Sequence, residues 1–597
     1  LIYPTHSNIA EELHRYDAEG INVAAYPVRT TLDTDHYAQN CWNQDADKAE
    51  QIGLPVAKTI CGGCPHRETC VDRGYLSQMI EAKEADVCLA THKRTAVTGF
   101  KELTVGRTYI SVHEDPLAIL RPTLSLNVQG LDEVAQFVTR LLTDPFYLDW
   151  YADGSTRDED GNVTFNEDQI IRRNRIYEAL LSLDGMVSDL QSTIDAAEQP
   201  TPWTSPVTID PPRGFEGFLW WAINHSRLRF TESPWQFLLS ALNGQIDETL
   251  VIVTDHHIKG ARQGATQQQK QCVGVIHNNP PNGCVVWIND ATADAEYLET
   301  LVDGPVHDQT PDGRVPLQHR TQQYVRDITR KTTPGMLLSL VRGLLCKYRD
   351  RERIGVITHS NLLPVINRME PEFSERIVKT TYFGSGDERS SNAWHNECDL
   401  ILILGTPRVP PSTVITLLAQ IGELKAAQTI PKWDVVHWYA RTTQGEQKKF
   451  EGRGYYDPIW LKAHRAIVRS NLVQAVGRGR GILDNGCDVI LLSSDECGLL
   501  VIDERVPLLN ERLLQVCIKL QHLTARKPNN SIIGKLAVST SQVANAINAP
   551  QRTARQLLSE LEQLGLIHRE SPRSGWMLTS PAPAHTSTLM EEPIDAN

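Results

Sequence analysis

The sequence predicts an α/β protein built around parallel β-sheets. At the N-terminus an apolar stretch at 1–3 ends in a polar loop, helical spacing follows over 8–16, and a second apolar stretch covers 21–26. A strand, a helix and a strand in this order are typical of a parallel sheet. Further stretches of strand length lie at 86–92, 108–112, 250–253, 283–288, 353–358, 399–404 and 487–492, and most of them end in polar residues.

The composition fits a globular chain of several domains, with 597 residues, 41% of them hydrophobic and 22% charged. This length leaves room for roughly three to five domains. No apolar run approaches the ~20 residues that span a bilayer, and no signal peptide is recognisable. We therefore expect no membrane partner and a cytoplasmic location, at the nucleoid if the source is a prokaryote. The net charge of −14 excludes a chain that is basic throughout, but not local basic grooves.

Four cysteines near the N-terminus form a cluster. Cys41, Cys61, Cys64 and Cys70 follow the order Cys-x19-Cys-x2-Cys-x5-Cys, with two glycines between the second and the third. Four thiolates satisfy either tetrahedral zinc or a [4Fe–4S] cluster, and spacing does not choose between them. His66 would replace one cysteine in a Cys3His zinc site. Most other cysteines stand singly in apolar stretches, as buried thiols do in a reducing compartment.

Polar side chains lie at or near the ends of the expected strands. Those singled out are Thr5, His6, Thr91, His92, His113, Glu114, Asp115, Asp290, Thr358, His359, Asn392 and Arg408. The alternative interpretation of the three residues from His113 is a polar loop at a strand end.

A Gln and two arginines mark the stretch 470–481. Gln474, Gly477, Arg478 and Arg480 follow an expected helix at 460–469 and precede the apolar stretch at 487–492. The guanidinium fork suits phosphate, and two such forks at one helix end would hold a γ-phosphate and stabilise transition-state charge. The alternative is an Arg-Gly loop that touches nucleic acid backbone or only solvent.

In their order along the chain, these segments resemble the motifs of superfamily 2 helicases. Pro4-Thr5-His6 is similar to motif Ia, His113-Glu114 to the Walker B motif, 289–294 to motif III, 358–361 to motif IV, 381–408 to motif V and 474–480 to motif VI. A four-cysteine insert between motif Ia and the Walker B acids resembles the XPD/DinG-type iron–sulfur helicases.

The resemblance implies an ATP-dependent DNA helicase with two RecA-like domains, ATP and Mg²⁺ between them, and single-stranded or forked DNA as partner in replication or repair. It implies that Glu114 is the base, with Asp115, Gln474, Arg478 and Arg480 as further catalytic residues. His113, Asp290 and Gly477 would bind the nucleotide. The four cysteines would hold [4Fe–4S], with Zn²⁺ as the alternative. Nucleic acid would be contacted by Thr5, His6, Thr91, His92, Thr358, His359, Asn392 and Arg408.

Two departures from the family pattern bear on hydrolysis. The pattern requires Asp at the position of His113, and imidazole is a poor ligand for magnesium. The P-loop motif G-x-x-x-x-G-K-[ST] is absent from the chain. Because Leu1 already lies in an expected strand, we expect a fragment or a processed form whose P-loop lies upstream, and weak ATP hydrolysis by this chain. The alternatives are a catalytically inactive helicase-like DNA-binding protein and a zinc-containing replication or transcription regulator.

The C-terminal part predicts a winged helix. Helices at 541–548 and 551–564 precede two short strands, and Arg552 and Arg555 lie near the start of the second helix. Such domains bind duplex DNA or dock on proteins. The expected regions are a partial RecA-like domain 1 over 1–119 with a Cys-cluster insert at 36–75, a helical insert with the remainder of domain 1 over 120–248, a RecA-like domain 2 over 249–507, the winged helix over 508–580 and a disordered tail over 581–597.

Overall fold

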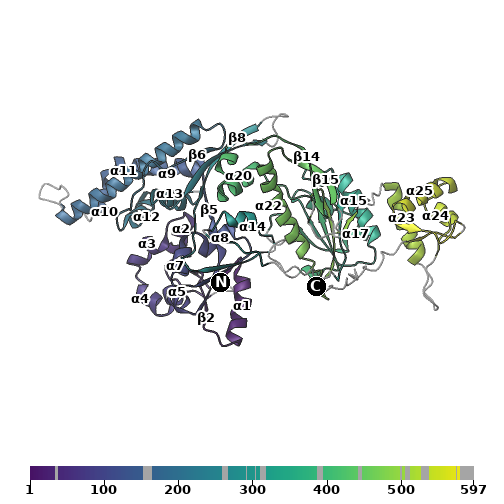
Figure 1. Cartoon of the computed structure of the whole chain (residues 1–597), viewed down its shortest axis with the longest axis horizontal. Coiled ribbons are helices and arrows are strands. Elements are labelled where there is room, and N and C mark those ends of the chain that lie inside the picture. Colours follow the sequence, from purple (N-terminus) through teal and green to yellow (C-terminus); the bar gives the residue numbers. More distant parts are fainter. Residues whose placement is uncertain are drawn as a thin grey trace, which may run out of the picture. The chain divides into compact units, whose positions relative to one another are not determined.

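The structure is a computed structural model, and it describes residues 1–33, 38–151, 165–226, 228–230, 232–257, 266–290, 292–302, 304–309, 318–385, 394–441, 447–495, 497, 501–503, 511–525, 537–572 and 574–578. The chain forms two compact units. Unit 1 comprises Leu1–Asp308 and Pro410–Pro431, and unit 2 comprises Gln309–Val409 and Lys432–Asn597. Each contains a parallel sheet, so the expected α/β class is confirmed (Figure 1).

Unit 1 is organised around a five-stranded parallel sheet in the order β2-β3-β1-β4-β9. Its strands are β1 (Ile2–Tyr3), β2 (Val23–Ala25), β3 (Val87–Thr91), β4 (Tyr109–His113) and β9 (Val285–Asn289). Helix α1 (His6–Ala18) crosses from β1 to β2. The Thr5 hydroxyl caps α1 by accepting a hydrogen bond from the Asn8 amide.

The expected Cys-cluster insert lies between β2 and β3. Its helices are α2 (Asp45–Gln51), α3 (Val56–Thr59), α4 (Arg67–Arg73) and α5 (Tyr75–Glu84), with a 3₁₀ turn at Cys61–Gly63. Because α5 leads directly into β3, the insert is anchored at the sheet that carries the first strand-end residues.

A second, antiparallel sheet of unit 1 has the order β5-β8-β7-β6, and the sequence did not predict it. Its strands are β5 (Thr123–Asn127), β6 (Thr201–Trp203), β7 (Glu248–His257) and β8 (Thr266–Val275). The helices α9 (Val128–Thr143), α11 (Glu167–Ala196), α12 (Phe215–Ser226) and α13 (Pro234–Leu242) share one core with it. Trp235 is fully buried there. Helix α20 (Pro411–Gln420), from the later part of the chain, packs on β7.

The boundary between the units differs from the one expected at 249. Strands β7 and β9, expected in the second domain, lie in unit 1, and β9 pairs in parallel with β4. An apolar strand has the same sequence pattern whichever sheet it joins. Its partner depends on contacts that local periodicity does not contain.

Unit 2 contains a six-stranded parallel sheet in the order β12-β11-β13-β16-β10-β17. Its strands are β10 (Thr321–Val325), β11 (Ile354–Thr358), β12 (Ile377–Tyr382), β13 (Leu400–Leu404), β16 (Asp488–Ser493) and β17 (Val501–Asp503). Leu400, Leu402 and Leu404 share a core with α15 (Pro334–Lys347), whereas Ile401 and Ile403 share one with α22 (Pro458–Gly477). Helices thus cover both faces of the sheet (Figure 1), which explains the unbroken apolar run of β13.

Unit 2 also carries a long hairpin and the C-terminal elements. The hairpin pairs β14 (Trp433–Arg441) with β15 (Gln447–Tyr455). The C-terminal elements are α23 (Glu511–Ala525), α24 (Thr540–Ala546), α25 (Gln551–Gln563), β18 (Ile567–His568) and β19 (Met577–Leu578), in the expected order. Short helices complete the chain: α6 (His92–Arg94), a π-helix at Thr95–Gly99, α7 (Phe100–Thr104), α8 (Leu117–Leu120), α10 (Pro145–Tyr151), α14 (Ala295–Glu299), α16 (Leu363–Ile366), α17 (Pro371–Ser374), α19 (Trp394–Glu397) and α21 (Leu424–Ala427).

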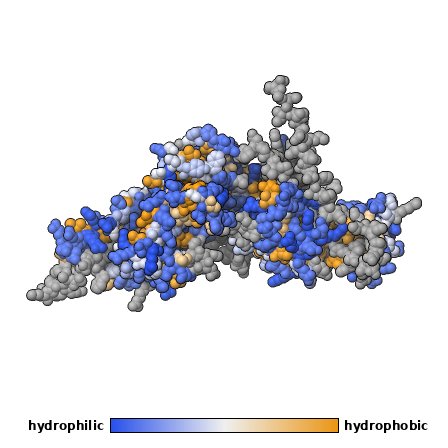
Figure 2. Space-filling model, turned by 90° about the horizontal axis from the view of Figure 1, so that it is seen from below, coloured by the Kyte–Doolittle hydropathy of each residue, from blue (hydrophilic) through white to orange (hydrophobic). Residues whose placement is uncertain are grey.

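The face of the molecule drawn in Figure 2 is mainly hydrophilic. Figure 2 shows a face on which hydrophilic residues predominate and hydrophobic residues form small groups between them. Among the described residues, no helix has the length and apolar character needed to cross a membrane. Asn392, Arg573 and the expected tail from 581 lie outside the described residues.

Candidate functional site

The carboxyl edge of the unit 1 sheet gathers residues from distant parts of the sequence. The His92 ring nitrogen Nε2 lies 2.8 Å from the His113 carbonyl oxygen, which joins the end of β3 to that of β4. The Asp115 amide donates to Asp290 Oδ2 at 3.0 Å, and the Glu114 amide donates to the Asn289 carbonyl at 2.9 Å. The Walker B-like and motif III-like segments therefore form one connected edge.

The turn after β4 has an uncommon backbone conformation. Glu114 has φ of 59° and Asp115 has φ of 40°, and both side chains are exposed. A left-handed conformation costs a non-glycine residue roughly 1–2 kcal/mol. Strain of this kind concentrates at functional sites. Two adjacent carboxylates presented in this way form a candidate site for a cation or for activating water.

His113 belongs to the body of the sheet. Its ring stacks on Tyr3 with centroids 4.2 Å apart, and its Nε2 lies 3.1 Å from Ser111 Oγ. Burial lowers the pKa of His113. Within the part of the chain that the structure describes, no group of three or more His, Cys, Asp or Glu side chains is arranged to hold a metal ion.

Two strand-end residues of unit 1 also cap helices. The Thr91 hydroxyl accepts a hydrogen bond from the Arg94 amide at the start of α6, as the Thr5 hydroxyl does at α1. Burial lowers the pKa of His6 and His92. Thr5, Thr91 and His92 thus hold the loops of this edge in place.

The four cysteines of the insert line one cavity, together with Arg29 and His66. Two hydrogen bonds of the type that thiolates accept are in place. The Leu76 amide lies 3.4 Å from Cys70 Sγ, and Asn43 Nδ2 lies 3.8 Å from Cys64 Sγ. Burial raises the pKa of Cys41 and Cys61, and the Arg29 guanidinium opposes this rise. Cysteine thiols are the donors of zinc and iron–sulfur centres, but these described side chains are not gathered around a single ion.

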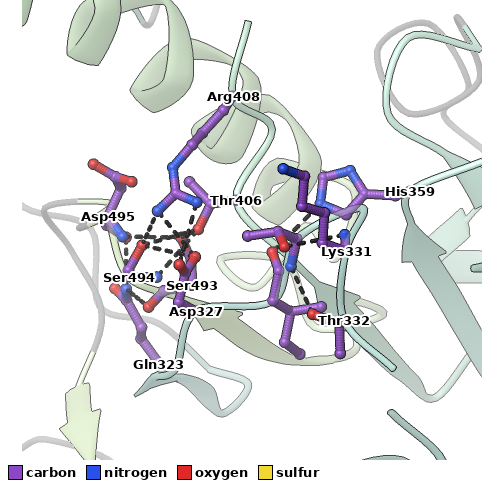
Figure 3. A network of polar contacts seen from close by, with 12 residues as sticks. Gln323, Asp327, Lys331, Thr332, His359, Thr406, Arg408, Ser493, Ser494 and Asp495 are labelled. Carbon is purple, nitrogen blue, oxygen red and sulfur yellow. Dashed lines mark hydrogen bonds and ion pairs between the residues drawn. The ribbon is translucent and has the colours of Figure 1, made fainter. Parts of the chain in front are cut away.

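A polar network occupies the carboxyl edge of the unit 2 sheet (Figure 3). Arg408 follows β13 and forms an ion pair with Asp327, with Nη2 2.9 Å from Oδ1. The same nitrogen donates to Ser494 Oγ at 3.0 Å. The Thr406 and Ser493 hydroxyls lie 3.0 Å apart in the buried centre of the network. This network fixes the ends of β10, β13 and β16 relative to one another.

Thr358 and His359 are more buried than a direct nucleic acid contact requires. Thr358 is fully buried and donates its hydroxyl hydrogen to the Leu404 carbonyl at 2.8 Å. His359 is 5% exposed, and a Cβ at Gly405 would lie 2.7 Å from its Nε2. In the structure they support the loop after β13, and the nucleic acid contact expected of them stays a prediction.

The motif VI-like residues lie at the opposite, amino edge of that sheet. Gln474 and Gly477 belong to α22, which continues beyond the expected end at 469 because Leu472 and Ala475 keep the buried helical spacing. Arg478 is 8% exposed and Arg480 is exposed. The following Gly481 carbonyl accepts from the Gln318 amide, three residues before β10. These arginines therefore lie on a different edge from Arg408.

Sequence reasoning missed Gly479 as a determinant of this turn. A Cβ at Gly479 would lie 2.3 Å from Val489 Cγ2 and 3.1 Å from the Cys487 carbonyl oxygen, whereas a Cβ at Gly477 would meet nothing within 4 Å. The turn packs so closely on β16 at Gly479 that a side chain has no room there. The alternating Gly-Arg pattern was the signal, but it does not say which glycine matters.

The C-terminal arginines are accessible. Arg552 and Arg555 are exposed in the first turns of α25, opposite Ala554 and Leu558, which are buried. The Arg569 guanidinium is held by Glu562 at 3.0 Å and lies over the Trp576 ring. Val538 pairs with Trp576 beside the β18–β19 hairpin.

The solved structures that resemble this chain include two with low TM-scores. No family model matches the chain, and no curated protein matches it. An apo structure of XPD is similar at a TM-score of 0.32 and 12% identity, over 82% of this chain and 96% of that one. The Escherichia coli DEAH/RHA helicase HrpB is similar at a TM-score of 0.15 and 8% identity, over 47% of this chain and 36% of that one. We rest no functional argument on likenesses of this degree.

Proposed function

We propose that this protein is a helicase-like, ATP-dependent translocase that acts on single-stranded or forked DNA in replication or repair. The observation that carries the proposal is where the motif-like residues lie. All except the motif VI-like residues follow the carboxyl ends of strands, namely β1, β3, β4 and β9 in unit 1 and β11 and β13 in unit 2. This edge of a parallel sheet is where α/β proteins bind nucleotides and other ligands.

In this proposal the turn after β4 is the centre of nucleotide chemistry. Glu114 would orient the attacking water, and Asp115 with Asp290 would supply oxygen ligands for Mg²⁺, which prefers oxygen. The Asp115 amide already binds the Asp290 carboxylate, which supports a shared role. We propose that Gln474, Gly477, Arg478 and Arg480 of unit 2 bind phosphate groups, because guanidinium groups stabilise transferring phosphoryl charge. His113 would line the site.

We propose that Cys41, Cys61, Cys64 and Cys70 hold a [4Fe–4S] cluster. Their side chains line one cavity. Four thiolates can bind a [4Fe–4S] cluster or zinc, and the place of the cysteines between the motif Ia-like and Walker B-like segments favours the cluster. When bound, such a cluster stabilises the insert and can exchange electrons.

For the C-terminal region we propose a winged helix that binds duplex DNA. Helix α25 presents Arg552 and Arg555 to solvent at its start, and recognition helices meet DNA with these positions. The β18–β19 hairpin would be the wing.

A second candidate is a helicase-like DNA-binding protein without catalytic activity. His113 favours it, because the ring at the expected magnesium position is engaged by Tyr3 and Ser111. Both the translocase and the inactive DNA-binding protein would bind nucleic acid, but only the translocase would hydrolyse ATP.

The test measures single-stranded DNA binding and DNA-stimulated ATP hydrolysis by the full chain. We expect binding with slow hydrolysis, since the sequence lacks the P-loop motif and has His113. His113→Asp should raise turnover, and Glu114→Gln should abolish it. Binding without hydrolysis in the wild type and in His113→Asp would favour the second candidate, and absence of binding would remove both.

A further inference from the structure

The β14–β15 hairpin has one packed face and one open face. On the inner face, Val436 and Trp438 are buried with Leu461 of α22, and Arg465 of α22 lies 4.6 Å from the Trp438 ring. Two glycines of β15 make this packing possible. A Cβ at Gly452 would lie 2.6 Å from Trp438, and one at Gly454 would lie 2.7 Å from Leu461. The inner face therefore fixes the hairpin on α22.

The outer face alternates with the inner one. Trp433 and Tyr455, at the base of this face, pack on His464 of α22, and beyond them the face carries aromatic and cationic side chains. Tyr439 is 62% exposed and stands directly opposite Lys449, which is also exposed. Towards the base, exposed Val435 stands opposite exposed Arg453. His437 and Glu451 form a pair between these two positions, with 3.6 Å between Nδ1 and Oε2.

A second exposed aromatic residue lies at the base of the hairpin. Tyr456 is 60% exposed, and Lys432 Nζ lies 5.6 Å from its ring centroid. Lys432 and Tyr439 are seven positions apart, which in a strand corresponds to about 23 Å. Each of these two places has an exposed ring and an ammonium group, and a third cation, Arg453, lies between them. The Lys432 ammonium is also ion-paired with Asp434 at 2.6 Å.

We propose that the outer face of this hairpin binds unpaired nucleotides of a single-stranded nucleic acid, with Tyr439 as the base-stacking residue. Aromatic rings stack on bases of any sequence, and neighbouring cations neutralise the phosphates. A protein partner would require an apolar centre, which this face lacks because Val435 is its only aliphatic side chain among the described residues. The inference rests on the proposed function and adds a binding surface that the helicase-like motifs do not contain.

The local charge supports a polyanion as the occupant. The chain as a whole carries −14, so a general attraction to nucleic acid is absent. On the outer face, Lys449 and Arg453 exceed the single carboxylate of Glu451, whereas Lys432 at the base of the hairpin is ion-paired with Asp434. Lys449 and Arg453 would make the binding dependent on salt.

The test uses the full chain and a fluorescein-labelled oligothymidylate, with fluorescence anisotropy as the readout. Tyr439→Ala should weaken binding roughly 5- to 150-fold, the range expected for loss of one stacked base. Tyr439→Phe keeps the ring and should bind within about twofold of the wild type. Lys449→Ala should reduce the slope of log K against log salt by about 0.7, the value for one phosphate of a single strand.

Two controls make the result specific. Tyr177 of α11 is 38% exposed in unit 1, and Tyr177→Ala should bind as the wild type does. An unlabelled duplex should compete poorly, since its bases are already stacked. Wild-type affinity in Tyr439→Ala, or equal competition by duplex, would overturn the hairpin proposal but leave the proposed function standing. If the wild type itself does not bind, both fall.

Discussion

At the scale of single residues, His464 shows how burial sets a response to pH. It lies on the inner side of α22, is 1% exposed, and has the rings of Trp433 and Tyr455 against it. Neither ring nitrogen has a hydrogen-bond partner among the described residues. Burial, with smaller contributions from Arg408 and Arg465, lowers the pKa of His464 to about 4. The folded state therefore holds this imidazole neutral.

This predicts a loss of stability in acid. Between the ordinary pKa of 6.5 and the folded value of about 4, the unfolded chain binds a proton that the folded chain does not. Stability from His464 is thus present above pH 6.5 and falls by up to roughly 3 kcal/mol as the pH decreases through this window. His464→Phe keeps the aromatic packing and removes the titration. Urea unfolding of both proteins should show their difference growing towards acid, and a constant difference would contradict the assignment.

A second prediction at this scale concerns the two glycines of the arginine turn. Gly479→Ala should destabilise unit 2 by about 1–3 kcal/mol, because the added Cβ meets Val489. Gly477→Ala is the matched control, and as a helical position it should be neutral or stabilising by up to about 1 kcal/mol. The pair Gly479→Ala with Val489→Ala should recover part of the loss, measured by urea unfolding as a double-mutant cycle. Equal effects of the two glycine substitutions would refute the packing explanation.

At the scale of elements, we make one prediction for the Cys-cluster insert, which is a metal centre, and one for α25, which is binding of duplex DNA. Both were delimited from the sequence, the insert by its cysteine spacing and α25 by its amphipathic pattern. In both cases the structure adds the surroundings: a cavity with Arg29 for the cysteines, and an exposed helix start for the two arginines. Each expectation can be tested without the other.

Anaerobically purified protein should be brown, with absorbance near about 400 nm and iron in excess of zinc. Cys64→Ser should lose most of the iron and the colour. Cys284→Ser is the control, because Cys284 stands at the start of β9 outside the cavity. A colourless protein with one zinc per chain would refute the iron assignment while keeping the site, and would favour a structural metal.

Replacing both Arg552 and Arg555 with Ala should weaken binding of the full chain to duplex DNA. The loss should be about 1–3 kcal/mol for each arginine that reads a base, and less for one that touches phosphate. Gln563→Ala, exposed at the other end of α25, should change little. The affinity should also fall steeply with salt. Duplex binding unchanged in the double variant would instead point to a docking role for this face.

At the scale of the whole molecule, the sequence predicted the strands better than their partners. Strand-end residues such as Glu114 and Asp290 were found because apolar runs followed by polar residues are visible locally. The antiparallel sheet of unit 1, the return of α20 to that unit and the β14–β15 hairpin were not predicted. They depend on contacts between segments far apart in the chain. Side-chain burial was equally invisible in the sequence, as the buried Thr358 and His359 show.

The measurement that tests the account most directly is equilibrium binding of the full chain to single-stranded DNA over a range of salt concentrations. The proposal predicts saturable binding at low salt, with log K decreasing linearly with log salt as several phosphates are neutralised. In the double variant Arg552→Ala with Arg555→Ala, the proposed duplex site is disabled. This variant should therefore bind a duplex more weakly than a single strand of the same length. Absence of single-stranded DNA binding at low salt, in a protein shown to be folded, would contradict the helicase-like function.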